Sequence, residues 1–178
     1  NPLIEACAKQ DIRPIVFRQE RGGINAADGF SRQMAGKEIG VFAAQDGPGV
    51  ENSFGGIAQA YGEAVPLLFL PQGYAQTNYD IAPNFSAKQN YAHVTKLAVS
   101  IDQVEQTSRE MRRAFHAMKH GRPGPALVEM PRDVMAQAVT ETEAQYTSTQ
   151  VMRSAPSVGD VQDSVRALLA AKCPVIWA

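Results

Sequence analysis

The sequence predicts an α/β fold, a three-layer α/β/α arrangement with a mainly parallel central sheet, followed by the start of a second α/β domain. Two observations lead to this class. Short apolar runs alternate along the chain with longer stretches of helical periodicity, and strands that alternate with helices pair in parallel through right-handed crossovers. The composition, with 44% hydrophobic and 20% charged residues in 178, is ordinary for a chain that buries a core.

Five apolar runs are expected to form strands. They are residues 12–17, 39–44, 65–70, 97–101 and 126–130. Each is short, and most are followed by a Gly, Pro or Asp that favours a turn.

Helical patterns lie between these runs. The first covers residues 24–35, and a later one covers residues 102–120. Asp102 and Glu105 match a capping box at the start of the later helix, and Gly121 ends it. Between the two, one helix face is expected to carry Phe54, Ile57, Ala58 and Tyr61.

The pattern changes near residue 136. Residues 1–135 are expected to form one domain that lacks its start, and the polar residues 136–156 are expected to form a linker. Residues 157–178 then match the first helix and strand of a second domain, with the strand at 174–177. We therefore expect an excerpt of a longer protein, cut at both ends.

The bulk composition argues against several classes of partner. A net charge of −1 provides no basic surface for nucleic acid or anionic lipid. No apolar run approaches the roughly 20 residues that cross a bilayer. Cys7 and Cys173 lie too far apart in sequence for a disulfide framework or a metal motif, which favours a reducing, cytoplasmic location. His116 and His120 are spaced i, i+4, but no third ligand accompanies them, so we expect no metal there.

Glu20 is the most informative residue. It stands where residues 12–17 give way to a helix, and ligands of open α/β sheets collect at the carboxyl ends of strands. Residues 46–49 and 71–73 follow two further strands and are expected to line the same crevice. Glu20 is therefore a candidate for proton chemistry. The residues alone leave open a second interpretation, an acid that merely stabilises the start of its helix.

The turn Gly47-Pro48-Gly49 exposes its backbone at the start of the next helix. It matches neither the P-loop nor the G-x-G-x-x-G spacing, so a dinucleotide-binding domain is disfavoured. Asp46 and Glu51 would repel a polyphosphate. A neutral ring that contacts the backbone fits this turn better.

Several segments together resemble a known family. They are Arg18-Gln19-Glu20 with residues 27–32 and Gly36-Lys37, Gly47-Pro48-Gly49 with Asn52, residues 60–66, Thr95-Lys96, and residues 121–134. In order and at compatible spacing, they resemble the N-terminal pyrimidine-binding domain of the thiamine-diphosphate-dependent enzymes related to acetolactate synthase. The resemblance covers about residues 4–134.

The resemblance implies roles for five residues. The matching Glu of the family, here Glu20, hydrogen-bonds a ring nitrogen of the cofactor pyrimidine and favours the imino tautomer of its amino group, which then removes the thiazolium C2 proton. Gly47, Pro48, Gly49 and Asn52 would line the pyrimidine side of this site. The implied reaction is decarboxylation or carboligation of a 2-keto acid by a C–C lyase or transferase.

The resemblance also implies what the chain needs from elsewhere. Mg and the cofactor diphosphate are bound in the family by another domain, so the excerpt alone is expected to be inactive. FAD is bound by some relatives, and the sequence leaves it open here. Active sites of the family lie between subunits, which implies a homodimer or homotetramer.

The chain departs from the family at three places. Gln45-Asp46 precede the Gly-Pro-Gly turn instead of Thr-Ser, and Gly73-Tyr74 and residues 85–87 replace segments that serve the acceptor side in acetolactate synthases. The keto acid and its acceptor therefore stay open. Glyoxylate carboligases lack the Glu, so Glu20 argues against that assignment. The alternative is a non-catalytic α/β binding or assembly module in which Glu20 caps a helix.

Overall fold

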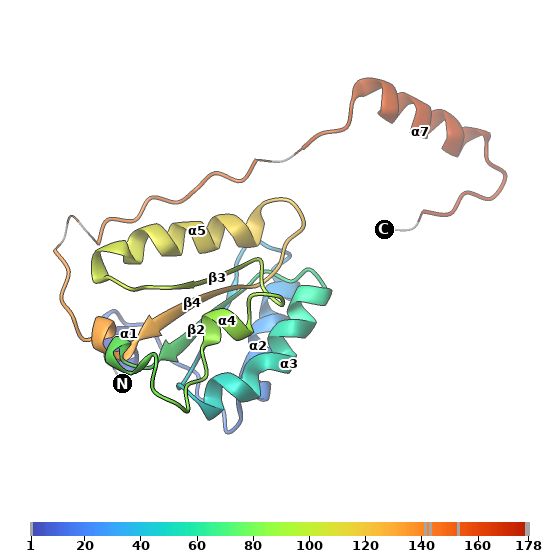
Figure 1. Ribbon diagram of the computed structural model, residues 1–178. Helices are drawn as coiled ribbons and strands as arrows, with labels where there is room; N and C mark the ends of the chain where they lie inside the picture. The colour runs from blue at the N-terminus through green and yellow to red at the C-terminus, as the bar shows by residue number, and fades with distance from the viewer. Residues whose placement is uncertain (1, 141, 143, 153, 177–178) are drawn as a thin grey trace.

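The computed structural model describes residues 2–140, 142, 144–152 and 154–176. Its elements are α1 (Pro2–Lys9), α2 (Glu20–Gln33), β1 (Gly40–Ala44), α3 (Pro48–Gly62), β2 (Leu67–Gly73), η1 (Gln76–Asn78), α4 (Ala87–Asn90), β3 (Leu97–Ser100), η2 (Val104–Gln106), α5 (Thr107–Lys119), β4 (Ala126–Pro131), α6 (Arg132–Met135) and α7 (Val158–Ala170). Within the described residues the sheet has four strands, all parallel, in the order β1-β2-β4-β3 (Figure 1). The predicted fold class of the first domain is confirmed.

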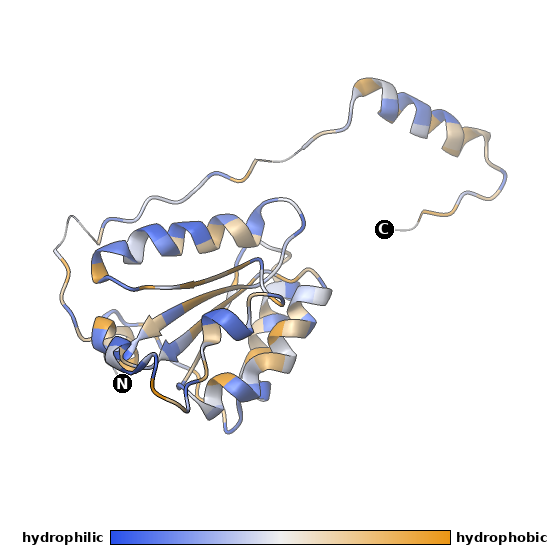
Figure 2. Ribbon diagram, viewed as in Figure 1, coloured by the Kyte–Doolittle hydropathy of each residue, from blue (hydrophilic) through white to orange (hydrophobic). Residues whose placement is uncertain are grey.

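The core forms two clusters, one on each face of the sheet. Leu67 and Phe69 of β2 point toward α2, α3 and α4, whereas Leu68 between them points toward α5. This alternation follows from the two-residue period of a strand, and it makes β2 apolar on both faces. Figure 2 shows the hydrophobic colours concentrated along the central strands. The helices therefore cover both faces, as three layers require.

Helix α2 approaches its neighbours very closely. A Cβ at Gly40 would lie 2.0 Å from the carbonyl oxygen of Ala27, and a Cβ at Gly56 would lie 1.9 Å from Cγ2 of Ile24. Because both positions are glycine, α2 can pack directly on β1 and on α3. This packing brings the first turn of α2 beside the first turn of α3.

The prediction of a strand at residues 12–17 is wrong. These residues have no regular structure, and their apolar side chains are exposed, with Val16 at 86%. A strand forms only where a neighbour accepts its backbone hydrogen bonds, and no strand in the described part of the chain lies beside this segment. The prediction rested on hydrophobicity alone, and the described residues contain no neighbouring strand with which this segment could pair.

Three smaller expectations also need correction. The capping box at Asp102 and Glu105 does not form, because η2 intervenes and the residues before η2 and α5, Gln103 and Gln106, make no side-chain cap bond. Residues 174–176 form no strand, and Trp177 lies outside the described residues. The buried face of α3 is rotated from the predicted one, since Phe54 is 39% exposed while small residues contact α2.

The predicted helix after the linker is present as α7. Residues 136–156 carry no helix or strand where they are described. The domain boundaries at residues 135 and 156 stay predictions.

Glu129 is an unexpected acid within the buried strand β4. It is 6% exposed, and its Oε1 accepts a hydrogen bond of 3.2 Å from the backbone N–H of Ala87. Burial is the main cause that raises the pKa of this carboxyl above its usual value of 4.5, and the backbone hydrogen bonds partly oppose it. The native state therefore holds its proton more tightly than the unfolded chain does.

This burial predicts a dependence of stability on pH. As pH rises from 4.5 toward the higher pKa of the native carboxyl, the native state binds more protons than the unfolded state, so the free energy of unfolding falls. Glu129→Gln should remove this fall, because an amide does not titrate. Urea unfolding between pH 4 and pH 8 measures it, with the exposed Glu38→Gln as control. Equal pH slopes in Glu129→Gln and wild type would contradict the prediction.

Candidate functional site

The turn after β1 contacts the segment after β2. Gly47 has φ +67° and ψ −121°, a backbone conformation that side chains disfavour, and a Cβ there would lie 3.1 Å from the hydroxyl of Tyr74. Pro48 then begins α3, where its missing N–H costs no hydrogen bond. The turn at residues 46–49 therefore lies close to Tyr74, the residue after the expected edge at residues 71–73.

Glu20 faces this turn from the start of α2. It is the first residue of the helix and is partly buried. A Cβ at Gly49 would lie 3.5 Å from its Oε1, and Nδ2 of Asn52 lies 3.5 Å from its Oε2. The structure thus brings together Glu20, Gly49 and Asn52, which lie far apart in sequence, while Gly47 and Pro48 precede them in the same turn.

The contacts of Glu20 bear on the helix-cap interpretation. Within the described part of the chain, the hydrogen bond that its carboxylate accepts comes from Asn52 of α3. Gln19, the residue before the helix, makes no side-chain cap bond either. The carboxylate thus faces α3.

An ion pair lies next to the turn at residues 47–49. Nη2 of Arg132, which follows β4, lies 2.7 Å from Oδ2 of Asp46, which follows β1. The Asp46 side chain is 10% exposed and that of Arg132 is 59% exposed. From the sequence, Asp46 was expected to repel a polyphosphate, and the ion pair with Arg132 now offsets its charge. The available clue was that an acid and a base each follow a strand of the same parallel sheet.

Further contacts fix the surrounding loops. Both carboxylate oxygens of Asp133 accept from the N–H of Gln76, at 3.3 and 3.2 Å, which ties the end of β4 to η1. The buried Tyr91 donates its hydroxyl to the carbonyl of Val50 in the first turn of α3. Burial also raises the pKa of Tyr91, so this hydroxyl stays protonated.

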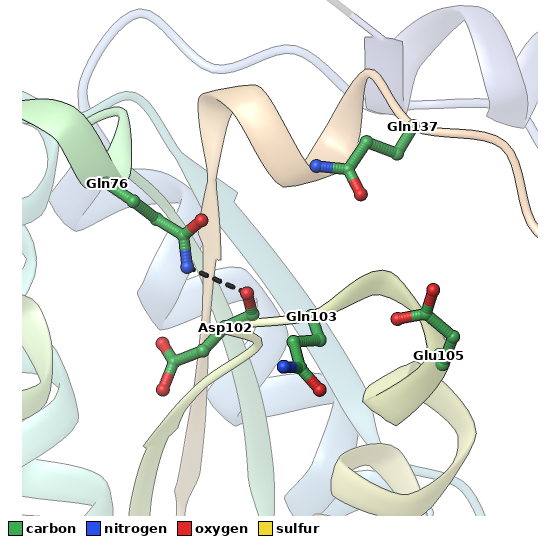
Figure 3. Close-up of a pocket in the computed structure, with 5 residues that line it drawn as sticks. All are labelled: Gln76, Asp102, Gln103, Glu105 and Gln137. Carbon is green, nitrogen blue, oxygen red and sulfur yellow. Dashed lines mark hydrogen bonds between the residues drawn. The ribbon is translucent and has the colours of Figure 1, made fainter.

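A second concavity, the amide hollow, lies outside the ends of β3 and β4. It encloses about 710 Å³ and is lined by Gln76, Asp102, Gln103, Glu105 and Gln137 (Figure 3). Nε2 of Gln76 donates to the carbonyl of Asp102 at 2.7 Å. None of the site residues predicted from sequence, Glu20, Gly47, Pro48, Gly49 and Asn52, lines it. Two carboxylates make it unfavourable for an anion, so we do not place a keto acid carboxylate there.

The next two features are a possible metal site and a possible membrane span, both considered in the described residues. There, no group of three or more His, Cys, Asp or Glu side chains has the arrangement of a metal site. His116 and His120 instead stack on each other, with ring centroids 3.6 Å apart. Among the same residues, no helix has the length and apolar character needed to cross a membrane.

Comparison with known proteins places this site in a family. The sequence pattern of the thiamine pyrophosphate enzymes, N-terminal TPP binding domain, matches residues 1–104. The chain belongs to this family. The match includes Glu20, Asn52 and the whole turn between them, and it confirms the resemblance stated from the sequence motifs.

The chain is similar to several characterised enzymes of this family. Glyoxylate carboligase of Escherichia coli O157:H7 is 31% identical over 100% of the chain and 30% of its own length. The acetolactate synthase isozyme 3 large subunit of Escherichia coli K12 is 29% identical over 93% of the chain and 30% of its own length. The acetolactate synthase large subunit of Lactococcus lactis is 31% identical over 99% of the chain and 31% of its own length. The chain thus spans under a third of the length of these relatives.

Proposed function

We propose that this chain forms the pyrimidine-binding part of a thiamine-diphosphate-dependent 2-keto acid decarboxylase or carboligase, with Glu20 as its catalytic residue. The observation that carries the proposal is the Glu20 carboxylate at the start of α2, facing Gly49 and Asn52 of α3. Membership of the thiamine pyrophosphate enzymes supports the cofactor. The names of the relatives support the reaction class.

The residues present fit an aminopyrimidine ring. Because Gly49 has no side chain, the space beside Oε1 of Glu20 is left free for a flat group. The turn offers backbone groups of Gly47 and Pro48, and the nearby charge of Asp46 is neutralised by Arg132. A carboxyl in such a place can share a proton with a ring nitrogen, which is the contact that the family chemistry requires.

Each residue then has a distinct task. Thiamine diphosphate, when bound, supplies the electron sink for breaking the bond next to a keto group. Glu20 holds the proton shared with the pyrimidine nitrogen, and Asn52 orients the Glu20 carboxylate as a positioning residue. The glycines of the turn allow close approach of the ring.

The remaining parts of the proposal concern the whole protein. We propose that Mg and the cofactor diphosphate are held outside this chain, that the protein is at least a homodimer with sites between subunits, and that it acts in the cytoplasm. FAD stays an open possibility of the family. The presence of Glu20 favours a reaction other than that of glyoxylate carboligases, which lack this acid.

Calorimetry on the whole protein tests the proposal. We expect thiamine diphosphate to bind in the presence of Mg, and CO2 to be released from at least one 2-keto acid in a screen of chain lengths. If the protein bound no thiamine diphosphate, a non-catalytic assembly module with Glu20 at a helix start would be the better interpretation.

A further inference from the structure

Helix α5 carries basic side chains along one face. Arg109, Arg112, Arg113 and His116 follow the i, i+3, i+4, i+7 spacing that places them side by side. A cavity of about 460 Å³, the arginine cavity, opens at this face and is lined by these four residues with Leu97, Ala117 and Thr149. Its size lies within the range of small-molecule sites. Leu97 belongs to the edge strand β3, so the cavity lies on the α5 side of the sheet, away from Glu20.

A buried carboxylate holds two of the arginines in place. The Glu110 side chain is 3% exposed, and its Oε1 accepts from Nε of Arg109 at 2.9 Å while its Oε2 accepts from Nη1 of Arg113 at 2.6 Å. A guanidinium has five N–H donors, so both arginines keep further donors for a ligand. Arg112 forms no ion pair in the part of the chain that the structure describes.

The charge of the cluster selects the kind of anion. Three arginines and one glutamate leave a net charge of +2 before His116 is counted. A phosphomonoester carries about −1.5 to −2 charges at pH 7, and guanidinium groups bind its oxygens in a bidentate manner. Leu97, Ala117 and the aliphatic stems of the arginines make the remaining wall apolar. The ligand that fits both features is a phosphate on a small apolar group.

Residues 146–152 line one side of the cavity through Thr149. The Tyr146 ring packs edge-on against Phe115 of α5, with ring centroids 6.2 Å apart. The backbone N–H of Met152 donates to Nε2 of His120 at 3.2 Å. These two contacts hold residues 146–152 along α5, so that Thr149 forms the outer wall.

We propose that the arginine cavity is a binding site for an organic phosphate, a phosphomonoester on a small apolar or aromatic group. It goes beyond the thiamine diphosphate function, because it shares no residue with the crevice at Glu20. Arg109 and Arg113, held by Glu110, bind the phosphate together with Arg112. The apolar wall binds the group attached to it.

Calorimetric titration of the whole protein with phenyl phosphate tests the proposal, with inorganic phosphate and phenol as separate arms. Phenyl phosphate should bind at least about tenfold more tightly than inorganic phosphate or phenol. Inorganic phosphate lacks the contacts with the apolar wall, and phenol lacks those with the arginines. Inorganic phosphate binding as tightly as phenyl phosphate would overturn the organic part of the proposal. Phenol binding as tightly would overturn the phosphate site itself.

Two variants separate the site from general charge. Arg112→Gln should weaken phenyl phosphate binding about tenfold or more, because it removes a charge-assisted contact without leaving Glu110 unpaired. Arg166→Gln is the matched control, since Arg166 is exposed on α7 and pairs with Asp163 three residues away. Equal weakening by both variants would overturn the proposal.

Arg113→Lys provides a variant that keeps the charge beside Glu110 but lacks the guanidinium fork. We expect it to fold with an unchanged urea midpoint and to weaken phenyl phosphate binding several-fold. Unchanged affinity in both Arg112→Gln and Arg113→Lys would show that the arginines do not bind the phosphate.

Discussion

Replacing Glu20 with Gln is expected to slow hydrogen–deuterium exchange at C2 of bound thiamine diphosphate by about 10²–10⁴-fold, the usual contribution of a positioned acid or base. The amide of Gln keeps the size of the side chain and can still accept from Asn52, but it carries no proton to share with the ring nitrogen. Nuclear magnetic resonance of the quenched cofactor, in the whole protein with Mg, measures the exchange rate.

The control for this variant is Glu38→Gln, which removes an exposed acid elsewhere in the first domain and should leave the rate unchanged. Thiamine diphosphate should still bind to Glu20→Gln, because the turn at residues 47–49 is intact. If Glu20→Gln kept the wild-type exchange rate, Glu20 would have no role in cofactor activation. It would then act only as a charge at the start of its helix, which contributes about 0.3–1 kcal/mol to stability.

Replacing Gly40 with Ala is expected to lower the free energy of unfolding by about 3 kcal/mol, at the upper end of the usual cost of overpacking. The added Cβ would lie 2.0 Å from the carbonyl oxygen and 2.6 Å from the carbonyl carbon of Ala27. Both are backbone atoms, so the contact is relieved only if α2 moves away from β1. Urea unfolding measures the loss.

Gly55→Ala is the matched control for Gly40→Ala. A Cβ at Gly55 would meet nothing within 4 Å, and the residue is exposed inside α3. Replacing a helical glycine by alanine at such a position should raise stability by roughly 0.5–1 kcal/mol. If Gly40→Ala were as stable as wild type, the close packing of α2 on β1 would be wrong.

The elements of the first domain were predictable where local pattern and tertiary context agree. Four of the five apolar runs became β1, β2, β3 and β4 because each has a parallel neighbour in the sheet. The run at residues 12–17 is also largely apolar, but it has no neighbouring strand among the described residues and stays irregular. The capping box at Asp102 failed for a related reason, since the carbonyl of Asp102 is engaged by Gln76 and a 3-10 turn precedes α5.

The candidate site divides in the same way. Glu20 and the turn at residues 47–49 were recognisable because each follows an apolar run and the order of motifs matches a family. Sequence reasoning did not find the Asp46–Arg132 ion pair or the buried Glu129. In each case the contact joins residues that are more than 40 positions apart in different elements, so local sequence patterns do not indicate it.

The sequence by itself determined the class of this protein, through the alternation of strands and helices and the motifs of the family, and it drew attention to the acid at position 20 that we propose as catalytic. Those features are local, because periodicity and short motifs depend on residues that are close together in the sequence. Only the tertiary structure decided that Glu20 faces Gly49 and Asn52, and that Asp46 is neutralised by Arg132. Such contacts depend on how closely helices pack on the sheet, and glycines at positions 40 and 56 set that distance.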